Sequence, residues 1–227
     1  MKILRFKELE STQTYAKSLI PSGLPVTVVA DKQTGGKGTK NRSFSSDVGG
    51  VYLTKLTFYD RFPAKNAFLV MASAAVAVCK TLESFGIKPK IKWANDIFVN
   101  DKKICGILTE NGFSSNTLKY SLVGIGLNVN NVLPEELKEI GITIKEATGR
   151  EFSVDEVTKK LVSELNRVSE MDEYLKRLGY MNEFATLIQG ERSVKVKLLS
   201  VEKTGELVVE EDGKTRKVAT GEVSLRV

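Results

Sequence analysis

The sequence predicts an α+β protein in which a mixed central sheet carries helices on one side and a small β-barrel follows at the C-terminal end. Two observations favour this class. Strand-like runs alternate with long helical runs over residues 1–187, whereas residues 188–227 contain short segments of period-two alternation separated by turns. With 227 residues, of which 41% are hydrophobic, the chain can bury one substantial core and a small additional unit.

The first 57 residues predict a strand, a helix, a strand, a glycine-rich loop and a further strand. Ser11 is a typical N-cap residue for a helix over residues 13–20, which Pro21-Ser22-Gly23 ends. Short buried strands are predicted at residues 26–30 and 51–58. The segment between them is rich in glycine and too long and too charged to be a simple hairpin turn.

The remaining elements follow from their periodicity. Residues 64–85 predict a long apolar helix packed on the sheet, and residues 154–178 predict one amphipathic helix. Residues 135–148 are polar and predict helical or irregular structure. Strands of the main body are predicted at residues 90–93, 97–99, 103–110 and 119–129. Strands of the small barrel are predicted at residues 193–199, 206–211, 216–220 and 223–227.

The composition excludes several kinds of chemistry. The chain contains no histidine, so Ser-His-Asp and Cys-His catalysis and any histidine-ligated zinc site are excluded. The net charge of +6 suits an anionic substrate, an acidic protein or nucleic acid, and does not choose among them. Cys79 and Cys105 predict reduced, buried thiols. We expect no membrane segment and a cytoplasmic location, because no signal peptide or apolar run of about 20 residues is present.

Three polar segments are candidates for a functional site. Residues 33–42 combine glycines, which free backbone N–H groups for an anion, with Lys37, Lys40 and Arg42, although an ordinary surface loop has a similar composition. Residues 92–97 and Lys103 place charges next to apolar runs, where each buried charge costs several kcal/mol, roughly, unless a partner such as an anion neutralises it. On its own, the tryptophan of this segment indicates a core side chain.

The third segment is Gly124 to Asn130. Two glycines in a strand weaken it by roughly 1 kcal/mol each, unless something must approach the backbone closely. Asn128 offers an amide oxygen that suits a hard cation such as magnesium. The segment therefore indicates a slot with a polar end.

The order and spacing of these motifs resemble those of the biotin protein ligases, and the resemblance covers essentially the whole chain. It implies a class II synthetase-like fold, the biotin-lipoate ligase catalytic domain, over residues 1–187 and an SH3-like barrel over residues 188–227. The motifs that carry it are Ser11-Thr12-Gln13, Gly36-Lys37-Gly38 with Arg42, Lys92 to Asp96, Lys103 to Leu108, Gly124 to Asn128, and the tail Gly221 to Arg226.

This resemblance implies a two-step reaction. Biotin is activated with ATP and Mg²⁺ to biotinyl-5′-AMP, and is then transferred to a lysine of a biotin carboxyl carrier protein. The implied catalytic residues are Lys103, Arg42 and Asp96, with Asn128 and Asp96 holding magnesium. The implied biotin contacts are Ser11, Thr12, Gln13, Gln33, Gly36, Lys37, Lys103 and Gly106. The implied ATP or adenylate contacts are Gly38, Thr39, Arg42, Phe44, Lys92, Trp93, Asn95, Gly124, Gly126 and Asn128.

Two alternatives stay open at this point. A lipoate or octanoate ligase or transferase has a similar fold, and ligand preference would distinguish it. A nucleic-acid-binding module would use the positive charge and the barrel, but the basic residues are interspersed with acidic ones. Because the strand pattern begins at Met1, we expect the short form without an N-terminal DNA-binding domain, and hence no binding to DNA. Either a monomer or a homodimer is compatible with the sequence.

The glycine-rich loop departs from the pattern of the family, which has arginines where this chain has Lys37, Thr39 and Lys40. A lysine is a point charge and a threonine carries none, so neither grips a phosphate in the bidentate way of arginine. We therefore predict weaker retention of the adenylate than in a typical relative. The measurement is the release of free biotinyl-adenylate into solution, and full retention would contradict the prediction.

Overall fold

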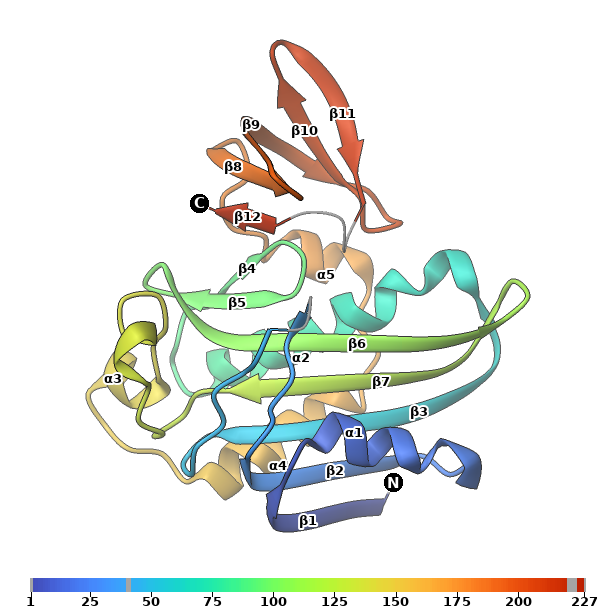
Figure 1. Cartoon of the computed structure of the whole chain (residues 1–227), viewed down its shortest axis with the longest axis vertical. Helices are drawn as coiled ribbons and strands as arrows, with labels where there is room; N and C mark the ends of the chain where they lie inside the picture. The colour runs from blue at the N-terminus through green and yellow to red at the C-terminus, as the bar shows by residue number, and fades with distance from the viewer. Residues whose placement is uncertain (1, 40–41, 220–223, 227) are drawn as a thin grey trace.

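The computed structural model describes residues 2–39 and 42–219 and the backbone of residues 224–226. A seven-stranded mixed sheet forms the main body, in the order β1-β2-β3-β7-β6-β5-β4 (Figure 1). Only β1 and β2 are parallel neighbours within it. The strands are β1 (Lys2–Leu9), β2 (Val26–Gln33), β3 (Val51–Pro63), β4 (Lys90–Lys92), β5 (Asp96–Val99), β6 (Lys102–Ser114) and β7 (Thr117–Leu127). The predicted α+β class is confirmed.

Two hydrophobic clusters cover the two faces of this sheet. The larger one packs α2 (Phe68–Ser84), α4 (Val154–Leu165) and α5 (Met171–Leu175) against one face, with side chains such as Leu53 and Ile125. The longer helices therefore lie on one side, as predicted. The short helix α1 (Thr12–Ser18) packs on the opposite face through Ala16, and this leaves the rest of that face open for a site.

Helix α2 is apolar because it lies in the core. Contrary to the expectation that no apolar run of this length is present, residues 64–84, which include the short 3₁₀ turn Ala64–Asn66, are long and apolar enough to cross a membrane by length and composition alone. Of the most apolar window in this stretch, 56% is buried within the structure, against the sheet and the neighbouring helices. Cys79 lies in this core and Cys105 lies in β6, and burial raises the pKa of both thiols, that of Cys79 to about 12.

The prediction of one helix over residues 154–178 was wrong. α4 ends at Leu165, Asn166 caps it, and α5 begins only at Met171. The connecting segment is held in place by a reciprocal pair of hydrogen bonds: the Ser169 N–H donates to the Ser73 hydroxyl, which donates to the Ser169 carbonyl. Tertiary hydrogen bonding to α2 therefore outweighs the helical periodicity of these residues. Residues 135–148 contain a 3₁₀ turn (Glu135–Leu137) and α3 (Ile144–Thr148).

A second, five-stranded antiparallel sheet follows in the order β11-β10-β9-β8-β12. Its first strand, β8 (Phe184–Gln189), was not predicted and spans the proposed boundary at residues 187 and 188, since it pairs along its length with β9 (Arg192–Val201). The others are β10 (Leu207–Glu211), β11 (Lys214–Val218) and β12 (Ser224–Arg226). Of the tail that resembles the family, residues 221–223 lie outside the described residues.

The two units are joined through the chain's only tryptophan. The Trp93 indole N–H donates to the Gly205 carbonyl at 2.9 Å, in the turn that precedes β10. The rings of Trp93 and Phe68, both in the main body, contact this turn. Gly205 has a φ of +94°, and a Cβ there would lie 2.1 Å from the ring of Phe68. The turn therefore docks only because residue 205 has no side chain.

We predict that Gly205→Ala lowers the free energy of unfolding by about 2–4 kcal/mol, since it combines strain at positive φ with overpacking against Phe68. The matched control is Gly213→Ala, in another turn of the same sheet, where φ is +73° and a Cβ meets nothing within 4 Å. This control should cost only about 1 kcal/mol. Denaturant unfolding measures both, and equal losses would contradict the packing argument.

Candidate functional site

The floor of the candidate site is set by strand register. β3, β7, β6 and β5 align two rows of residues across the sheet face opposite α2. Because directly opposed residues of antiparallel strands point to the same face, the members of each row share one surface. One row contains Tyr52, Gly126, Gly106 and Asp96. The next contains Thr54, Gly124 and Leu108.

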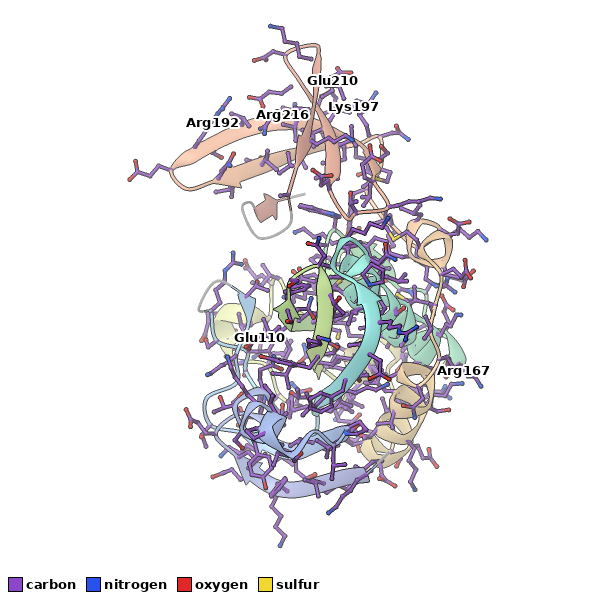
Figure 2. The ribbon with its side chains drawn as sticks, turned by 90° about the vertical axis from the view of Figure 1, so that its right-hand side faces the viewer. Glu110, Arg167, Arg192, Lys197, Glu210 and Arg216 are labelled. Atoms are coloured by element: carbon purple, nitrogen blue, oxygen red, sulfur yellow. The ribbon has the colours of Figure 1, made fainter. Side chains whose placement is uncertain are left out.

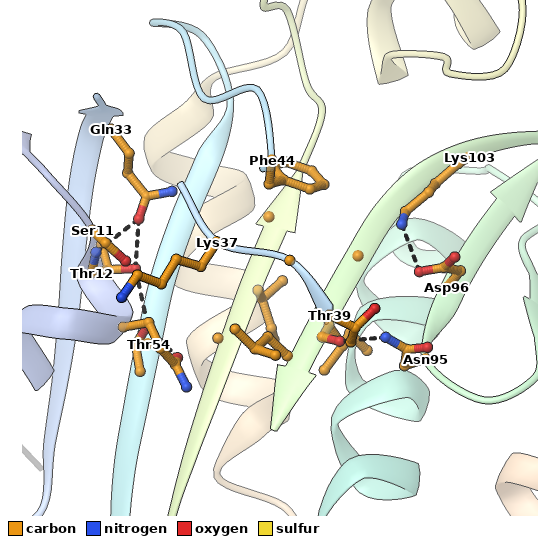
Figure 3. Close-up of a pocket in the computed structure, with 18 residues that line it drawn as sticks. Ser11, Thr12, Gln33, Lys37, Thr39, Phe44, Thr54, Asn95, Asp96 and Lys103 are labelled. Carbon is orange, nitrogen blue, oxygen red and sulfur yellow. Dashed lines mark hydrogen bonds and ion pairs between the residues drawn. The ribbon is translucent and has the colours of Figure 1, made fainter. Parts of the chain in front are cut away.

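The glycines of these rows leave a slot on the sheet surface, and the Phe44 ring of the glycine-rich loop covers part of it. A Cβ on Gly126 would lie 2.4 Å from the ring of Phe44, and one on Gly106 would lie 3.3 Å from the same ring. The ring centroids of Phe44 and Tyr52 are 6.5 Å apart, with their planes nearly perpendicular. The Phe44 ring therefore packs directly on bare backbone in the middle of the pocket (Figure 3).

The glycine-rich loop folds back on itself as a short hairpin over the slot. The Phe44 N–H donates to the Gly36 carbonyl and the Gly38 N–H donates to the Arg42 carbonyl, at 2.9 and 2.7 Å. The Gly38 N–H is thus used within the loop, whereas the sequence predicted an anion contact for the loop's glycines. A Cβ on Gly36 would lie 2.4 Å from the Phe44 carbonyl, so a glycine is needed at this crossing. Lys40 and Asn41 lie outside the described residues.

One end of the pocket is polar and almost completely buried. Ser11, Thr12 and Gln13 are each at most 4% exposed at the start of α1, and Thr54 is fully buried beside them. The Gln33 side-chain carbonyl accepts from the N–H and the hydroxyl of Thr12, at 2.8 and 3.0 Å. α1 begins here because the Ser11 side chain caps it by accepting from the N–H of Thr14.

Gln33 also ties the loop to this polar end. Its side-chain NH₂ donates to the Ser46 hydroxyl, which in turn donates to the Phe44 carbonyl, both at 2.9 Å. Both ends of the Gln33 side chain therefore have protein partners, and it positions Thr12 and the loop. Lys37 extends from the loop toward the same end of the pocket (Figure 3).

The other end of the pocket is charged. Lys103 Nζ lies 2.7 Å from Asp96 Oδ1, and both side chains are about one-third exposed. They line the slot and also the larger hollow of about 960 Å³ next to it, so the two spaces meet at this ion pair. Basic side chains predicted to bind phosphate, Arg42 and Lys92, line this hollow, and Lys92 Nζ lies 4.8 Å from the ring centroid of Phe98.

The two predicted magnesium ligands, Asp96 and Asn128, both line the larger hollow, and Asp96 also lines the slot. The Asn128 amide is 6% exposed; its NH₂ donates to the Ile142 carbonyl and its oxygen accepts from the NH₂ of Asn131. This amide oxygen therefore already has one protein partner, and magnesium binding by Asn128 stays a prediction. Within the described residues there is no group of three or more Asp, Glu or Cys side chains able to hold a metal. A single carboxylate suits Mg²⁺ that arrives with nucleotide phosphates.

Trp93 lines neither the slot nor the larger hollow, in contrast to its predicted contact with the adenylate. It is 7% exposed and belongs to the core, with its indole bonded to Gly205. Asn95 does line the slot, but its side-chain NH₂ is bound to the Ile107 carbonyl at 2.7 Å. It therefore holds the turn before β5 onto β6. Thr39 lines the slot. The weaker retention of an adenylate, which the sequence led us to expect from this threonine, stays a prediction.

Several pocket residues were not predicted from the sequence. The side chains of Thr54 and Leu108 line the slot, and Ser46 supports the loop. Ile107 and Ile125 border the slot only through the strand backbone, because their side chains lie in the core on the α2 face. Only the register connects them: Thr54 lies opposite Gly124, which itself lies opposite Leu108. The sequence offered one signal for these residues, the glycines Gly124 and Gly126, which indicated a site on β7, the strand next to them.

The chain is similar to known proteins over its whole length. The family model for the biotin/lipoate A/B protein ligase family matches residues 6–128, which is more than half of the chain. "Bifunctional ligase/repressor BirA" of Bacillus subtilis is 38% identical over 150 residues, which are 63% of this chain and 46% of that protein. The Escherichia coli protein of the same name is 27% identical over 87% of this chain and 65% of its own length.

Among solved structures, a biotin protein ligase from Aquifex aeolicus in complex with biotin and ATP superimposes with a TM-score of 0.79. It is 27% identical, and the match covers 99% of this chain and 98% of the other. The chain therefore spans about half the length of the Bacillus relative, but nearly all of the Aquifex protein.

The packing of Phe44 on the two glycines generates a prediction. Gly126→Ala should lower the free energy of unfolding by about 1–3 kcal/mol, because the new methyl group overlaps the Phe44 ring. Gly106→Ala should cost less, since its neighbours are at 3.2 Å or more and include the flexible Lys103 side chain. Denaturant unfolding measures both.

A double variant identifies the cause. In a Phe44→Ala background, Gly126→Ala should cost much less than in the wild type, because the overlapping ring is absent. An unchanged cost would show that the loss arises elsewhere in the strand.

Proposed function

Because this chain belongs to the biotin/lipoate A/B protein ligase family, we propose that it is a biotin protein ligase. In this proposal it joins biotin to ATP as biotinyl-5′-AMP and then transfers biotin to a lysine of a biotin carboxyl carrier protein. The proposed location is the cytoplasm. The similarity to ligases and to a structure with bound biotin and ATP supports the proposal.

The observation that carries this proposal is the polarity of the slot. Its buried end presents hydroxyls and amides, its middle is lined by Phe44, Leu108 and the bare backbone of Gly126, and its open end has the cation of Lys103. Biotin has a cyclic urea at one end, an apolar chain and a carboxylate at the other end. The order of chemical groups in the slot is therefore that of the ligand.

The lipoate alternative fits this slot less well. A dithiolane ring offers no N–H donor and no strong acceptor to Thr12, Gln13 and Thr54, all of which are buried. A buried acceptor without a hydrogen-bond donor costs about 1–3 kcal/mol, so a ring that supplies an N–H to this end of the slot is favoured.

In the first step of the proposed reaction, a carboxylate oxygen attacks the α-phosphorus of ATP and pyrophosphate leaves. Two anions must approach each other, and Lys103 supplies a fixed positive charge at the place where the slot meets the larger hollow. Arg42 and Lys92 add positive charge along that hollow. Magnesium bound near Asp96 would neutralise phosphate charge. Phe44 and the loop cover the slot and keep water from the mixed anhydride.

In the second step, the amine of the acceptor lysine attacks the carbonyl of the mixed anhydride and AMP leaves. We propose that Asp96 orients this amine or accepts its proton, because its carboxylate borders both the slot and the larger hollow through which an acceptor would enter. Its ion pair with Lys103 directs the carboxylate toward the reacting end.

Calorimetric titration with biotin and with lipoate, each with and without Mg-ATP, tests the function. We expect biotin to bind and pyrophosphate to be released when Mg-ATP is added. Lys103→Gln should weaken biotin binding about 10–100-fold, the value of a charge-assisted hydrogen bond to a carboxylate. Lys102→Gln is the matched control, since this neighbouring lysine donates to the Lys138 carbonyl outside the slot.

The outcomes separate the candidates. Binding of lipoate but not biotin would assign the chain to the lipoate branch of its family. Equal losses for the two lysine variants would contradict the role of Lys103.

A further inference from the structure

A carboxylate that none of the motifs includes lies directly behind the polar end of the slot. Glu110 is on β6 (Figure 2), two residues beyond Leu108 and hence on the same face of the sheet. Its Oε1 accepts a hydrogen bond from the Gln13 side-chain NH₂ at 3.1 Å, and its Oε2 accepts from Lys17 Nζ at 2.8 Å. Both oxygens of the carboxylate are therefore engaged by donors from α1.

This contact determines which way the Gln13 amide points. An ionised carboxylate only accepts hydrogen bonds, so the NH₂ of Gln13 must face Glu110 and its oxygen must face away. The oxygen lies 3.2 Å from the Thr54 hydroxyl, and it occupies the space above Gly124, where a Cβ would be 2.6 Å from it. Gln13 is 4% exposed, so no bulk water competes for this position.

The direction of the neighbouring hydrogen bonds is fixed from the opposite end. The Phe44 carbonyl can only accept, so the Ser46 hydroxyl donates its hydrogen to this carbonyl and accepts a hydrogen bond from the Gln33 NH₂. The Gln33 oxygen then accepts from Thr12, whose N–H can only donate. The Thr12 hydroxyl donates to the same oxygen and accepts from Thr54 at 2.9 Å.

The count of hydrogens leaves one acceptor short. The Thr54 hydroxyl has a single hydrogen, but two acceptors lie within reach of it, the Thr12 hydroxyl and the Gln13 oxygen. If the hydrogen goes to Thr12, the Gln13 oxygen lacks a donor among the described residues; if it goes to Gln13, the Thr12 hydroxyl lacks one. A ligand that supplies one N–H to this end of the slot completes the set.

We propose that Glu110 is a positioning residue for ligand choice: it holds the Gln13 oxygen toward the slot as the acceptor for one urea N–H of biotin. This rests on the proposed function. A dithiolane ring has no N–H to donate, so the arrangement favours the cyclic urea. Glu110 acts through Gln13 and does not itself contact the ligand.

The electrostatic surroundings keep Glu110 in the form that this role requires. Burial raises the pKa of its carboxyl group, but the hydrogen bonds and charge of Lys17 and the hydrogen bond from Gln13 outweigh burial, with a further contribution from Lys37. The pKa is therefore lowered, and Glu110 is ionised at neutral pH.

The substitution Glu110→Gln tests this role, because it should reverse the orientation of the Gln13 amide. Lys17 can only donate, so the new amide turns its oxygen to Lys17 and its NH₂ to Gln13. The Gln13 amide must then turn over and present its own NH₂ to the slot. An acceptor would thus be replaced by a donor, with almost no change in shape.

The experiment uses three ligands: biotin and the two cyclic carbamates in which one or the other urea N–H is replaced by a ring oxygen. Each is titrated into the wild type and the Glu110→Gln variant by calorimetry, and thermal unfolding of each variant is recorded. Glu8→Gln is the matched control, since it breaks a lysine–glutamate pair with Lys32 on β1 and β2, away from the slot.

In the wild type, biotin should bind more tightly than both carbamates. In the Glu110→Gln variant, biotin affinity should fall about tenfold, and the preference for biotin over one of the two carbamates should shrink or reverse. Glu8→Gln should leave all affinities unchanged. Unchanged ratios between the ligands would overturn the inference, whether or not Glu110→Gln weakens them all equally. A wild type that binds no biotin would instead overturn the proposed function.

Discussion

The antiparallel register of β3, β7 and β6 is the constraint on which the rest of the site depends. It places Tyr52, Gly126 and Gly106 in one row and Thr54 and Gly124 in the next. A shift by one residue would turn these groups toward α2 and move core side chains such as Leu53 and Ile125 into the slot. The buried face of the sheet therefore enforces the register, and the register builds the pocket on the other face.

The loop above the slot shares that dependence. Phe44 finds space only where two opposed glycines expose backbone, and Ser46 connects the same loop to Gln33 and Thr12. The glycine-rich loop is therefore held over the slot in two ways, by the packing of Phe44 and by the hydrogen bonds to the polar end. Because Thr12 opens α1, the position of the loop and the start of the helix are linked by hydrogen bonds of fixed direction.

Much of the fold could be predicted because local pattern and tertiary packing agree. The α+β class, the long core helix and most strands follow from periodicity, and the Ser11 cap was correctly placed. The predictions went wrong where long-range hydrogen bonds decide: Ser73 holds the segment that interrupts the helix predicted over residues 154–178, and β8 becomes a strand because it pairs with β9. Neither partner is visible in the local sequence.

The site shows the same division. The motif residues Ser11, Thr12, Gln13, Lys103 and Asp96 do line one slot, as their clustering indicated. Trp93 belongs to the same motifs but its side chain lies in the core, because residue type alone does not say which way a side chain points. Asn128 lines the larger hollow and also bonds the neighbouring Asn131. Thr54 and Glu110 were not predicted as site residues, because each matters only through its contact with Gln13, which is distant in the sequence.

The contact of Trp93 with Gly205 has a spectroscopic consequence. The chain's only tryptophan lies 7% exposed between the two units, so its fluorescence reports the docking of the C-terminal sheet. If that sheet separates while the main core stays folded, the indole loses its hydrogen bond and meets water, and its emission shifts to longer wavelength. The same segment carries Asp96, three residues further on, so the signal originates next to the charged end of the slot.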